Sequence, residues 1–193
     1  MLGLKLPTDP RWVNLASKNI EDILTDHAYC EQKAASSCIS LIQQYPEKTE
    51  MVDSVAPIVT EEWGHFRLVL HKLKERNLKL GRQRPDEYVN QLLKFLTKGA
   101  TRLDHFIDRL LICGMIEARS CERFRLLSVH LQDSELREFY HTFMVSEAGH
   151  YRLFLDLAKT YGDPVKVQAR WQELLIYEAN IMSNLSLRGD RMH

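Results

Sequence analysis

The sequence predicts an all-α fold: a four-helix bundle with one long crossover between its second and third helices, plus an additional C-terminal helix. Three observations predict it. Apolar residues recur at helical spacing over long segments, glycines and prolines fall mostly between those segments, and no run of alternating β-branched residues suggests a strand. The length of 193 residues, with 45% hydrophobic and 27% charged residues, suits a single domain over residues 1–193.

Turn-forming residues divide the apolar pattern into five main helices and one short helix. Pro57 should bend the first turns of the second helix, Asp133 is a plausible N-cap of the fourth, and Asp163-Pro164 has the cap-then-proline order typical of a helix start. The main helices are expected over residues 12–45, 51–77, 100–131, 134–161 and 163–187, and the short one over 86–96.

The lengths of the connections indicate how the helices are ordered. A few residues around Pro46 join the first and second helices, and a few around Gln132 join the third and fourth. More than twenty residues separate the second helix from the third. Short, long and short connections are typical of a ferritin-like bundle, which has one crossover.

Composition excludes several classes of protein. The formal net charge is zero, so nucleic-acid binding would need a local basic patch. The N-terminus has no uninterrupted apolar run, and no stretch is long enough to cross a membrane, so we expect neither a signal peptide nor a membrane contact. The cysteines form no CxxC pair and should be reduced thiols of a cytoplasmic protein. They are Cys30, Cys38, Cys113 and Cys121.

An internal repeat is the sharpest feature of the chain. Residues 62–70 (EWGHFRLVL) and 147–155 (EAGHYRLFL) are identical at six of nine positions, at an offset of 85. A similar offset of 86 relates Glu31 to Glu117. The first two long helices therefore resemble a copy of the next two, and the bundle should consist of two equivalent helical hairpins.

The repeat places one glutamate on the first helix of each hairpin and a Glu-x-x-His motif on the second. Residues at i and i+3 lie on one helix face, so both side chains can reach one ion. All these residues interrupt apolar stripes. Burial of an unpaired carboxylate in such a stripe would cost roughly several kcal/mol of folding free energy. Two divalent cations would remove that cost. The predicted metal ligands are Glu31, Glu62, His65, Glu117, Glu147 and His150.

This ligand set also indicates the metal. Mixed carboxylate and imidazole ligands suit iron or manganese, and thiolates, which would favour zinc, are absent from it. Six protein ligands on two ions leave coordination positions open, where dioxygen can bind. We predict two iron ions as the cofactor, with dioxygen as co-substrate.

The chain offers further acidic residues and histidines as candidate ligands. Glu122 is an alternative ligand on the third helix, but it lies about 140° around the helix from Glu117 and breaks the repeat, so Glu117 is preferred. A third Glu-x-x-His pair, Glu138 and His141, has no counterpart in the other hairpin and should face solvent.

Neighbours of the ligands leave alternatives open. His27 could orient Glu31 or be an ordinary core histidine, and Glu61 could orient a ligand histidine. Gly64 and Gly149 lie between the ligands at matching positions, which suggests tight helix packing there. Small residues could leave room for an apolar substrate or serve helix packing alone. They are Ala34, Ala35, Gly114 and Ala118.

A basic segment follows the second long helix. Residues 71–85 (HKLKERNLKLGRQRP) carry six lysines and arginines and only Glu75 as an opposing charge. Such a segment could bind phosphates, or it could be a solvated helix end that complements the helix dipole.

Several stretches resemble the bacterial tRNA methylthio-isopentenyl-adenosine hydroxylases, the MiaE family. The stretches are LPTDPRWV, DHAYCEQKAAS, EEWGHF, IEARSCERF and SEAGHY, and the resemblance covers nearly the whole chain. The Glu-x-x-His motifs alone would fit any ferritin-like protein, whereas the IEARSCERF and DHAYCEQKAA contexts are narrower.

The resemblance implies a ferritin-like, non-haem di-iron monooxygenase. It would hydroxylate the isopentenyl group of the modified adenosine beside the tRNA anticodon, with dioxygen and electrons from a reductant. All six predicted ligands match the family's ligands. The implied partners are tRNA, through its anticodon stem-loop, and an electron donor, with the chain as a monomer or small homo-oligomer. The alternatives are a ferritin- or rubrerythrin-like ferroxidase or peroxide scavenger, and a helical bundle with a vestigial acidic site.

Overall fold

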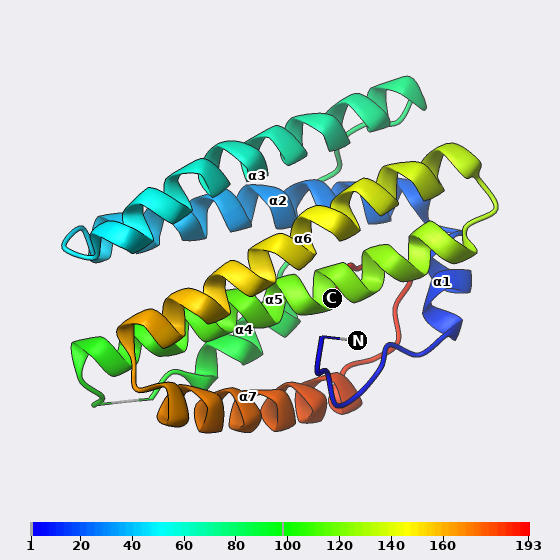
Figure 1. Cartoon of the computed structure of the whole chain (residues 1–193). Helices are drawn as coiled ribbons and strands as arrows, with labels where there is room; N and C mark the ends of the chain where they lie inside the picture. The colour runs from blue at the N-terminus through cyan, green and yellow to red at the C-terminus, as the bar shows by residue number, and fades with distance from the viewer. Residues whose placement is uncertain (1, 98) are drawn as a thin grey trace. The chain divides into compact units, whose positions relative to one another are not determined.

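The computed structural model describes residues 2–97 and 99–193, and within these ranges the chain is helical without strands (Figure 1). The predicted all-α class is therefore confirmed. The elements are α1 (Arg11–Ala16), α2 (Ile20–Gln44), α3 (Thr49–Glu75), α4 (Glu87–Leu92), the short 3-10 helix η1 (Leu93–Phe95), α5 (Arg102–His130), α6 (Ser134–Tyr161) and α7 (Pro164–Asn184).

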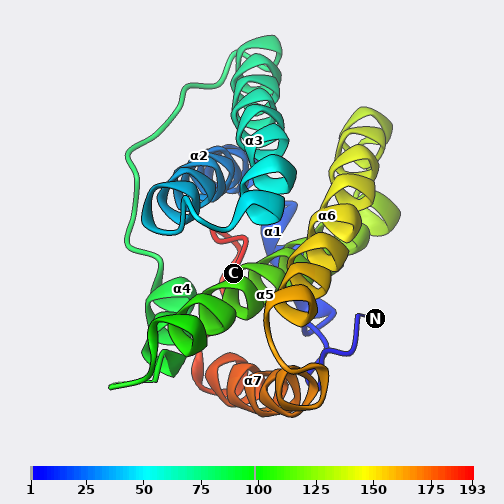
Figure 2. The ribbon, with the colours of Figure 1, turned by 60° about the vertical axis from the view of Figure 1, so that its left-hand side comes forward.

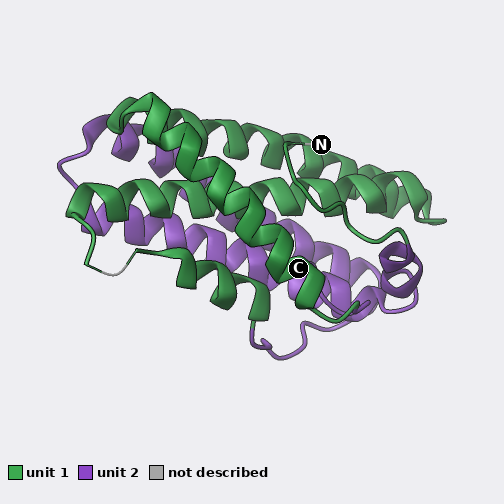
Figure 3. Cartoon of the chain, turned by 90° about the horizontal axis from the view of Figure 1, so that it is seen from below, with its two compact units in different colours: residues 1–10, 86–187, 193 green, residues 11–85, 188–192 purple. Residues whose placement is uncertain are grey.

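The helices belong to two compact units, coloured separately in Figure 3. The first-hairpin unit comprises residues 11–85 and 188–192 and holds α1 to α3. The second-hairpin unit comprises residues 1–10, 86–187 and 193 and holds α4 to α7. In each unit the predicted pairing is confirmed, because α2 packs along α3 and α5 packs along α6 (Figures 1 and 2).

The first predicted helix, residues 12–45, is in fact two helices. α1 ends at Ala16 and α2 begins at Ile20. Two polar side chains at the break bond to carbonyls of α1: Ser17 Oγ donates to Asn14 O at 3.0 Å, and Asn19 Nδ2 donates to Leu15 O at 2.8 Å. Such local side-chain bonds compete with the helical ladder, which explains why the apolar pattern alone missed the break.

The remaining boundaries agree with the sequence to within a few residues. Asp133 caps α6 by accepting from Leu136 N at 3.1 Å. Asp163 caps α7 by accepting from the amides of residues 165 and 166, with Pro164 at the first helical position. Pro57 lies inside α3, as expected. The short helix predicted over 86–96 is α4 followed by η1, and α7 ends at Asn184 rather than near residue 187.

The second-hairpin unit contains a buried cluster of charges around Arg119. This guanidinium is fully buried; its Nε donates to Glu178 Oε1 at 2.8 Å, and it also pairs with Glu122. The hydroxyl of Tyr88 donates to the same Glu178 oxygen at 3.2 Å. The cluster thus joins α4, α5 and α7 of this unit.

The N-terminal segment of the second-hairpin unit is held by the same cluster. Thr8 Oγ1 donates to Glu122 Oε2 at 2.6 Å, and Arg119 donates to Leu6 O at 2.9 Å. Burial raises the pKa of Glu178 and raises that of Tyr88 well above its ordinary value. Charges in such a place need their partners, since removal of one leaves the other uncompensated.

We therefore expect Glu178→Ala to destabilise the protein strongly, by about 3–5 kcal/mol, because it leaves the Arg119 charge buried without its main partner. Urea unfolding followed by circular dichroism would measure the change. Glu138→Ala, at an exposed position of α6, is the control and should shift the midpoint little. Equal midpoints for the two variants would show that the cluster contributes no stability.

Candidate metal centre

Three predicted ligands come together in the first-hairpin unit. Glu31 projects from α2, and Glu62 and His65 project from one face of α3. His65 Nδ1 lies 3.4 Å from Glu31 Oε2 and 3.7 Å from Glu62 Oε2, and all three residues offer ligand atoms within 4.8 Å of one another. The side chains are buried, with exposed fractions of 3%, 1% and 8%. We call these three residues the first triad.

The second-hairpin unit holds the equivalent set, which we call the second triad. Glu117 projects from α5, and Glu147 and His150 project from α6. His150 Nδ1 lies 3.4 Å from Glu147 Oε2, and the three residues again offer ligand atoms within 4.8 Å of one another. All three are buried. The sequence repeat is therefore a repeat of side-chain geometry within each unit.

Each triad presents two carboxylates and one imidazole. Two carboxylates this close in an apolar setting repel each other, and burial disfavours their charged forms. A divalent cation removes both penalties, and oxygen with imidazole ligands suits iron or manganese. In both triads the Nδ1 atom of the histidine faces a carboxylate, so this nitrogen is placed to bind the same ion. The donor set of each triad thus fits a metal ion.

His27 is attached to the first triad. Its Nε2 donates to Glu31 Oε1 at 2.7 Å, and its side chain is fully buried one turn before Glu31 on α2. The bond leaves Glu31 Oε2 facing His65 and fixes the orientation of the carboxylate. The orienting role predicts this bond, and the bond also satisfies one ring nitrogen of a buried histidine. Glu61 Oε1 lies 3.9 Å from His65 Nε2, which places it near the outer nitrogen of that histidine.

The alternative ligands have other roles. Glu122 is buried on α5, but its carboxylate bonds to Thr8 and pairs with Arg119. Glu138 and His141 are exposed on α6, as predicted. Glu117 stays the predicted ligand on α5.

The packing expectation for the ligand-flanking glycines is wrong. A Cβ added at Gly64 or at Gly149 would meet no atom within 4 Å outside its own helix turns. At Gly114 a Cβ would lie 3.6 Å from Phe154 Cβ and from Leu155 Cδ2 on α6, which is ordinary van der Waals contact. α5 and α6 therefore pack side by side at this glycine.

Cys113 and Cys121, on α5, are protonated thiols. All four cysteines are free thiols, as expected. Burial, with the nearby charge of Glu117, raises the pKa of Cys113 to about 12, and burial with Glu147 raises that of Cys121 to about 11. Thiols with such pKa values stay protonated at neutral pH.

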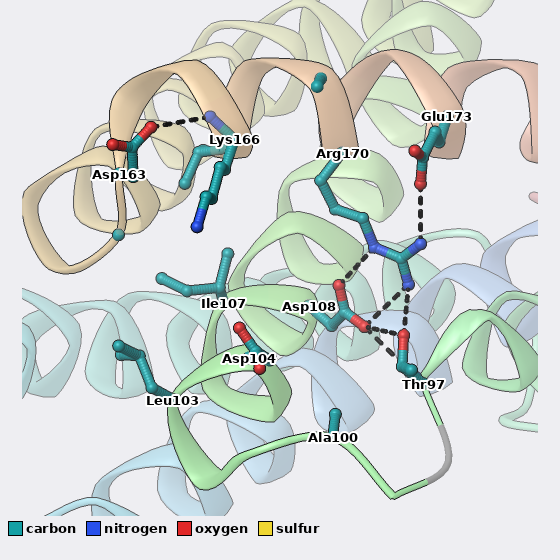
Figure 4. Close-up of a pocket in the computed structure, with 13 residues that line it drawn as sticks. Thr97, Ala100, Leu103, Asp104, Ile107, Asp108, Asp163, Lys166, Arg170 and Glu173 are labelled. Carbon is teal, nitrogen blue, oxygen red and sulfur yellow. Dashed lines mark hydrogen bonds and ion pairs between the residues drawn. The ribbon is translucent and has the colours of Figure 1, made fainter.

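A pocket of about 640 Å³ lies apart from the triads, between the starts of α5 and α7 and the segment around Thr97 (Figure 4). Its polar groups bond to one another. Arg170 donates to Asp108 at 2.7 Å, to Glu173 at 2.8 Å and to Thr97 Oγ1 at 2.9 Å, and stacks on the ring of Phe95. These bonds join α5 to α7 along the pocket wall.

Buried pairs of carboxylates and imidazoles on two helical hairpins define the ferritin-like class of metal proteins. A solved structure, protein 43 with aldehyde deformylating oxygenase activity from Synechococcus, matches with a TM-score of 0.92 and 32% identity, over 98% of this chain and 94% of that one. The predicted ferritin-like fold class is thereby confirmed.

The chain belongs to the MiaE family: the family model described as tRNA-(MS[2]IO[6]A)-hydroxylase (MiaE) matches residues 2–193. A curated relative from Pseudomonas putida is 38% identical over 89% of this chain and 82% of its own length. One from Salmonella typhimurium is 27% identical over 97% of this chain and 85% of its own. Both are named tRNA 2-(methylsulfanyl)-N(6)-isopentenyladenosine(37) hydroxylase. The resemblance found in the sequence is confirmed.

Two variants on α5 distinguish the candidate ligands. Glu117→Ala should lower the iron bound per chain after anaerobic reconstitution, because it removes one carboxylate from the second triad. Glu122→Ala should keep the iron content but lower the melting temperature, because it removes a partner of Arg119. Iron analysis and thermal unfolding of both proteins would measure this. The same loss of iron in both would mean that the ligand assignment on α5 is wrong.

Proposed function

We propose that this protein hydroxylates the isopentenyl group of 2-methylthio-isopentenyl-adenosine next to the anticodon of tRNA, as a non-haem di-iron monooxygenase. The observation that carries the proposal is the family match over residues 2–193, to relatives named for this reaction. The two triads support it independently, since each supplies the carboxylates and imidazole that such chemistry needs.

We further propose that the triads together hold two iron ions in one domain comprising residues 1–193. Support comes from the repeat, which gives both hairpins the same donor set, and from the burial of all the carboxylates. When bound, the iron centre would supply the reduction of dioxygen and the insertion of one oxygen atom into a C–H bond. The ligands would be Glu31, Glu62, His65, Glu117, Glu147 and His150.

The chain's own contribution is to position groups and to exclude water. His27 holds the carboxylate of Glu31 in one orientation through its 2.7 Å bond. Buried apolar side chains of α2 and α3 flank the first triad, among them Ala28 and Val69, so bulk water has little access there. A dry site protects the oxidising chemistry from side reactions.

The balance of the reaction requires a further partner. One oxygen atom of dioxygen enters the substrate as a hydroxyl group, and the other leaves as water, which consumes two electrons and two protons from outside the substrate. An electron-donor protein or small reductant must supply the electrons. None of the described helices is long and apolar enough to cross a membrane. A cytoplasmic location and a monomeric or small oligomeric state remain predictions.

A single turnover tests the proposal directly. Reduced, iron-loaded protein is mixed with ¹⁸O-labelled dioxygen and prenylated tRNA, and the digested nucleosides are analysed by mass spectrometry. We expect one labelled oxygen atom on the prenylated adenosine. Glu62→Ala should abolish this product by disrupting the first triad, whereas Glu138→Ala on the exposed face of α6 should not. Oxygen consumption with unchanged tRNA would instead support the ferroxidase alternative.

Aldehyde deformylation is a second candidate function, because the solved structure with a TM-score of 0.92 is named for that activity. The fold therefore admits both chemistries, and the outer surface must distinguish them. Exposed basic residues follow α3 in this chain, which suits an anionic polymer better than a fatty aldehyde.

We accordingly expect the reduced, iron-loaded protein to convert no long-chain aldehyde to hydrocarbon and formate under conditions that hydroxylate prenylated tRNA. Gas chromatography of the organic phase and a formate assay would measure this. Hydrocarbon formation at a rate comparable to that of tRNA hydroxylation would contradict the assignment of tRNA as the substrate.

A further inference from the structure

One face of α3 carries a stripe of residues outside the proposed metal site, in which Trp63, Arg67 and Lys74 are exposed and Leu70 is half-buried. Trp63, Arg67, Leu70 and Lys74 follow one another at intervals of four, three and four residues, the spacing of one helix face. Trp63 directly follows the ligand Glu62, and the stripe extends about 17 Å along the helix, at 1.5 Å per residue. We call it the α3 stripe.

Trp63 is exposed where tryptophan is usually buried. It is 47% exposed, whereas the other tryptophans, Trp12 and Trp171, are 0% and 5% exposed. Its ring lies beside that of Phe66, with centroids 4.9 Å apart and planes inclined by 35°. An exposed aromatic pair next to a buried metal triad is available for stacking with a planar ligand group.

The cations of the α3 stripe have no ion-pair partner among the described residues. Arg67 and Lys74 are exposed and form no ion pair with any described residue, and no acidic residue occurs between positions 63 and 74. Lys72, outside the stripe, is instead paired with Glu75 at 2.7 Å. The helix dipole would account for Lys74 in the last turn but not for Arg67, which lies two turns earlier.

The chain continues from α3 into a crossover segment, residues 77–85, that lies on α2 within the same unit. Gly81 N donates to Thr25 Oγ1 at 3.2 Å, and Tyr29 donates its hydroxyl to Gly81 O at 3.0 Å. These bonds hold the segment by its backbone. The side chains of Lys79 and Arg82 therefore stay exposed, and neither pairs with a described residue.

The structure thus divides the basic segment of the sequence into two groups. Arg84 is held internally, by Asp22 at 3.1 Å and Asp190 at 2.9 Å, as Lys72 is by Glu75. Four cations remain unpaired by described residues and exposed: Arg67, Lys74, Lys79 and Arg82.

We infer that the α3 stripe and the crossover segment form the RNA-binding surface of this protein, with Trp63 stacking on an unpaired base of the anticodon loop and the four cations binding the phosphate backbone. The inference rests on the proposed function. Single-stranded loops are recognised by aromatic stacking, and phosphate contacts supply most of the affinity. A base stacked on Trp63 would hold the loop next to the ligand-bearing turn of α3.

The repeat supplies an internal control for this surface. The positions of α6 that match Trp63, Arg67 and Lys74 are Ala148, Arg152 and Lys159. Here the aromatic ring is missing, and Lys159 lies 3.5 Å from Asp156. The same helix positions thus carry comparable charge but no stacking group, which makes variants on α6 matched controls.

The first experiment measures binding without turnover. A fluorescent anticodon stem-loop that contains prenylated adenosine is titrated with iron-loaded protein at several salt concentrations. R67Q/K74Q should weaken binding about tenfold or more and reduce the slope of log K against log salt by about 0.7–0.9 for each lost phosphate contact. K79Q/R82Q should act similarly, whereas R152Q/K159Q should bind like the wild type.

The second experiment addresses stacking. Trp63→Ala should weaken binding about five- to one-hundredfold, the effect of losing one base–aromatic stack. Trp63→Phe, which keeps a ring, should recover much of the loss. In the wild type, the stem-loop should protect the exposed tryptophan from acrylamide quenching, and Trp63→Phe should remove that protection. Trp63→Ala should raise KM for tRNA with little change in kcat or iron content.

The outcomes separate this inference from the proposed function. Weakened binding by the variants, with a wild type that binds but does not hydroxylate, would support the surface and contradict the function. Hydroxylation by the wild type, with unchanged RNA binding by all the variants, would overturn the surface and keep the function. Variants that bind RNA like the wild type but are reduced more slowly by an electron-donor protein would also overturn the inference. The surface would then bind an acidic protein.

Discussion

The burial of carboxylates inside the apolar faces of both hairpins is the constraint on which the rest of the structure depends. Glu62 and Glu147 are 1% and 2% exposed, at helix positions that would otherwise hold leucine or valine. A chain keeps charges in such places only if something compensates them. Each triad does so by presenting two carboxylates and an imidazole to a common point, which suits a divalent cation. The helix pairing, the i and i+3 spacing and the bond from His27 all serve that arrangement.

The two buried glutamates of α5 show two ways to meet the same constraint. Glu122 is compensated from within the chain, by Arg119 and by Thr8 from the N-terminal segment. Glu117, five residues earlier on the same helix, belongs to the second triad, where we propose a metal ion in the place of the guanidinium. An internal cation makes a glutamate structural, whereas an exchangeable one leaves it available for chemistry. This difference, rather than burial or residue type, distinguishes the structural glutamate from the candidate ligand.

The sequence predicted the local part of this organisation and missed the non-local part. The repeat, the apolar stripes and the Glu-x-x-His spacing are periodic, so they identified the hairpins and both triads. The cluster around Arg119 depends on bonds to Thr8, 111 positions away, and to Glu178, 59 positions away, and no periodicity reveals such partners. The packing prediction for Gly64 and Gly149 was wrong for a related reason. The free-energy cost of a glycine within a helix is a local property, but the atoms that a side chain would meet there depend on the neighbouring helices.

The comparison of the two hairpins also indicates where substrate choice resides. On the buried faces of α3 and α6 the predicted ligands match, and the spacing of Glu62 and His65 is repeated by Glu147 and His150. On the outer faces Arg67 is matched by Arg152, but Trp63 corresponds to an alanine, and Lys159, which corresponds to Lys74, is paired with an aspartate. A metal site with ligands from both hairpins constrains the sequence of both hairpins equally. A substrate that docks on one hairpin constrains the sequence of that hairpin alone. The asymmetry of the outer faces is therefore what a symmetric metal centre with a single large substrate would produce, and a shared fold can serve an aldehyde in one protein and a tRNA in another.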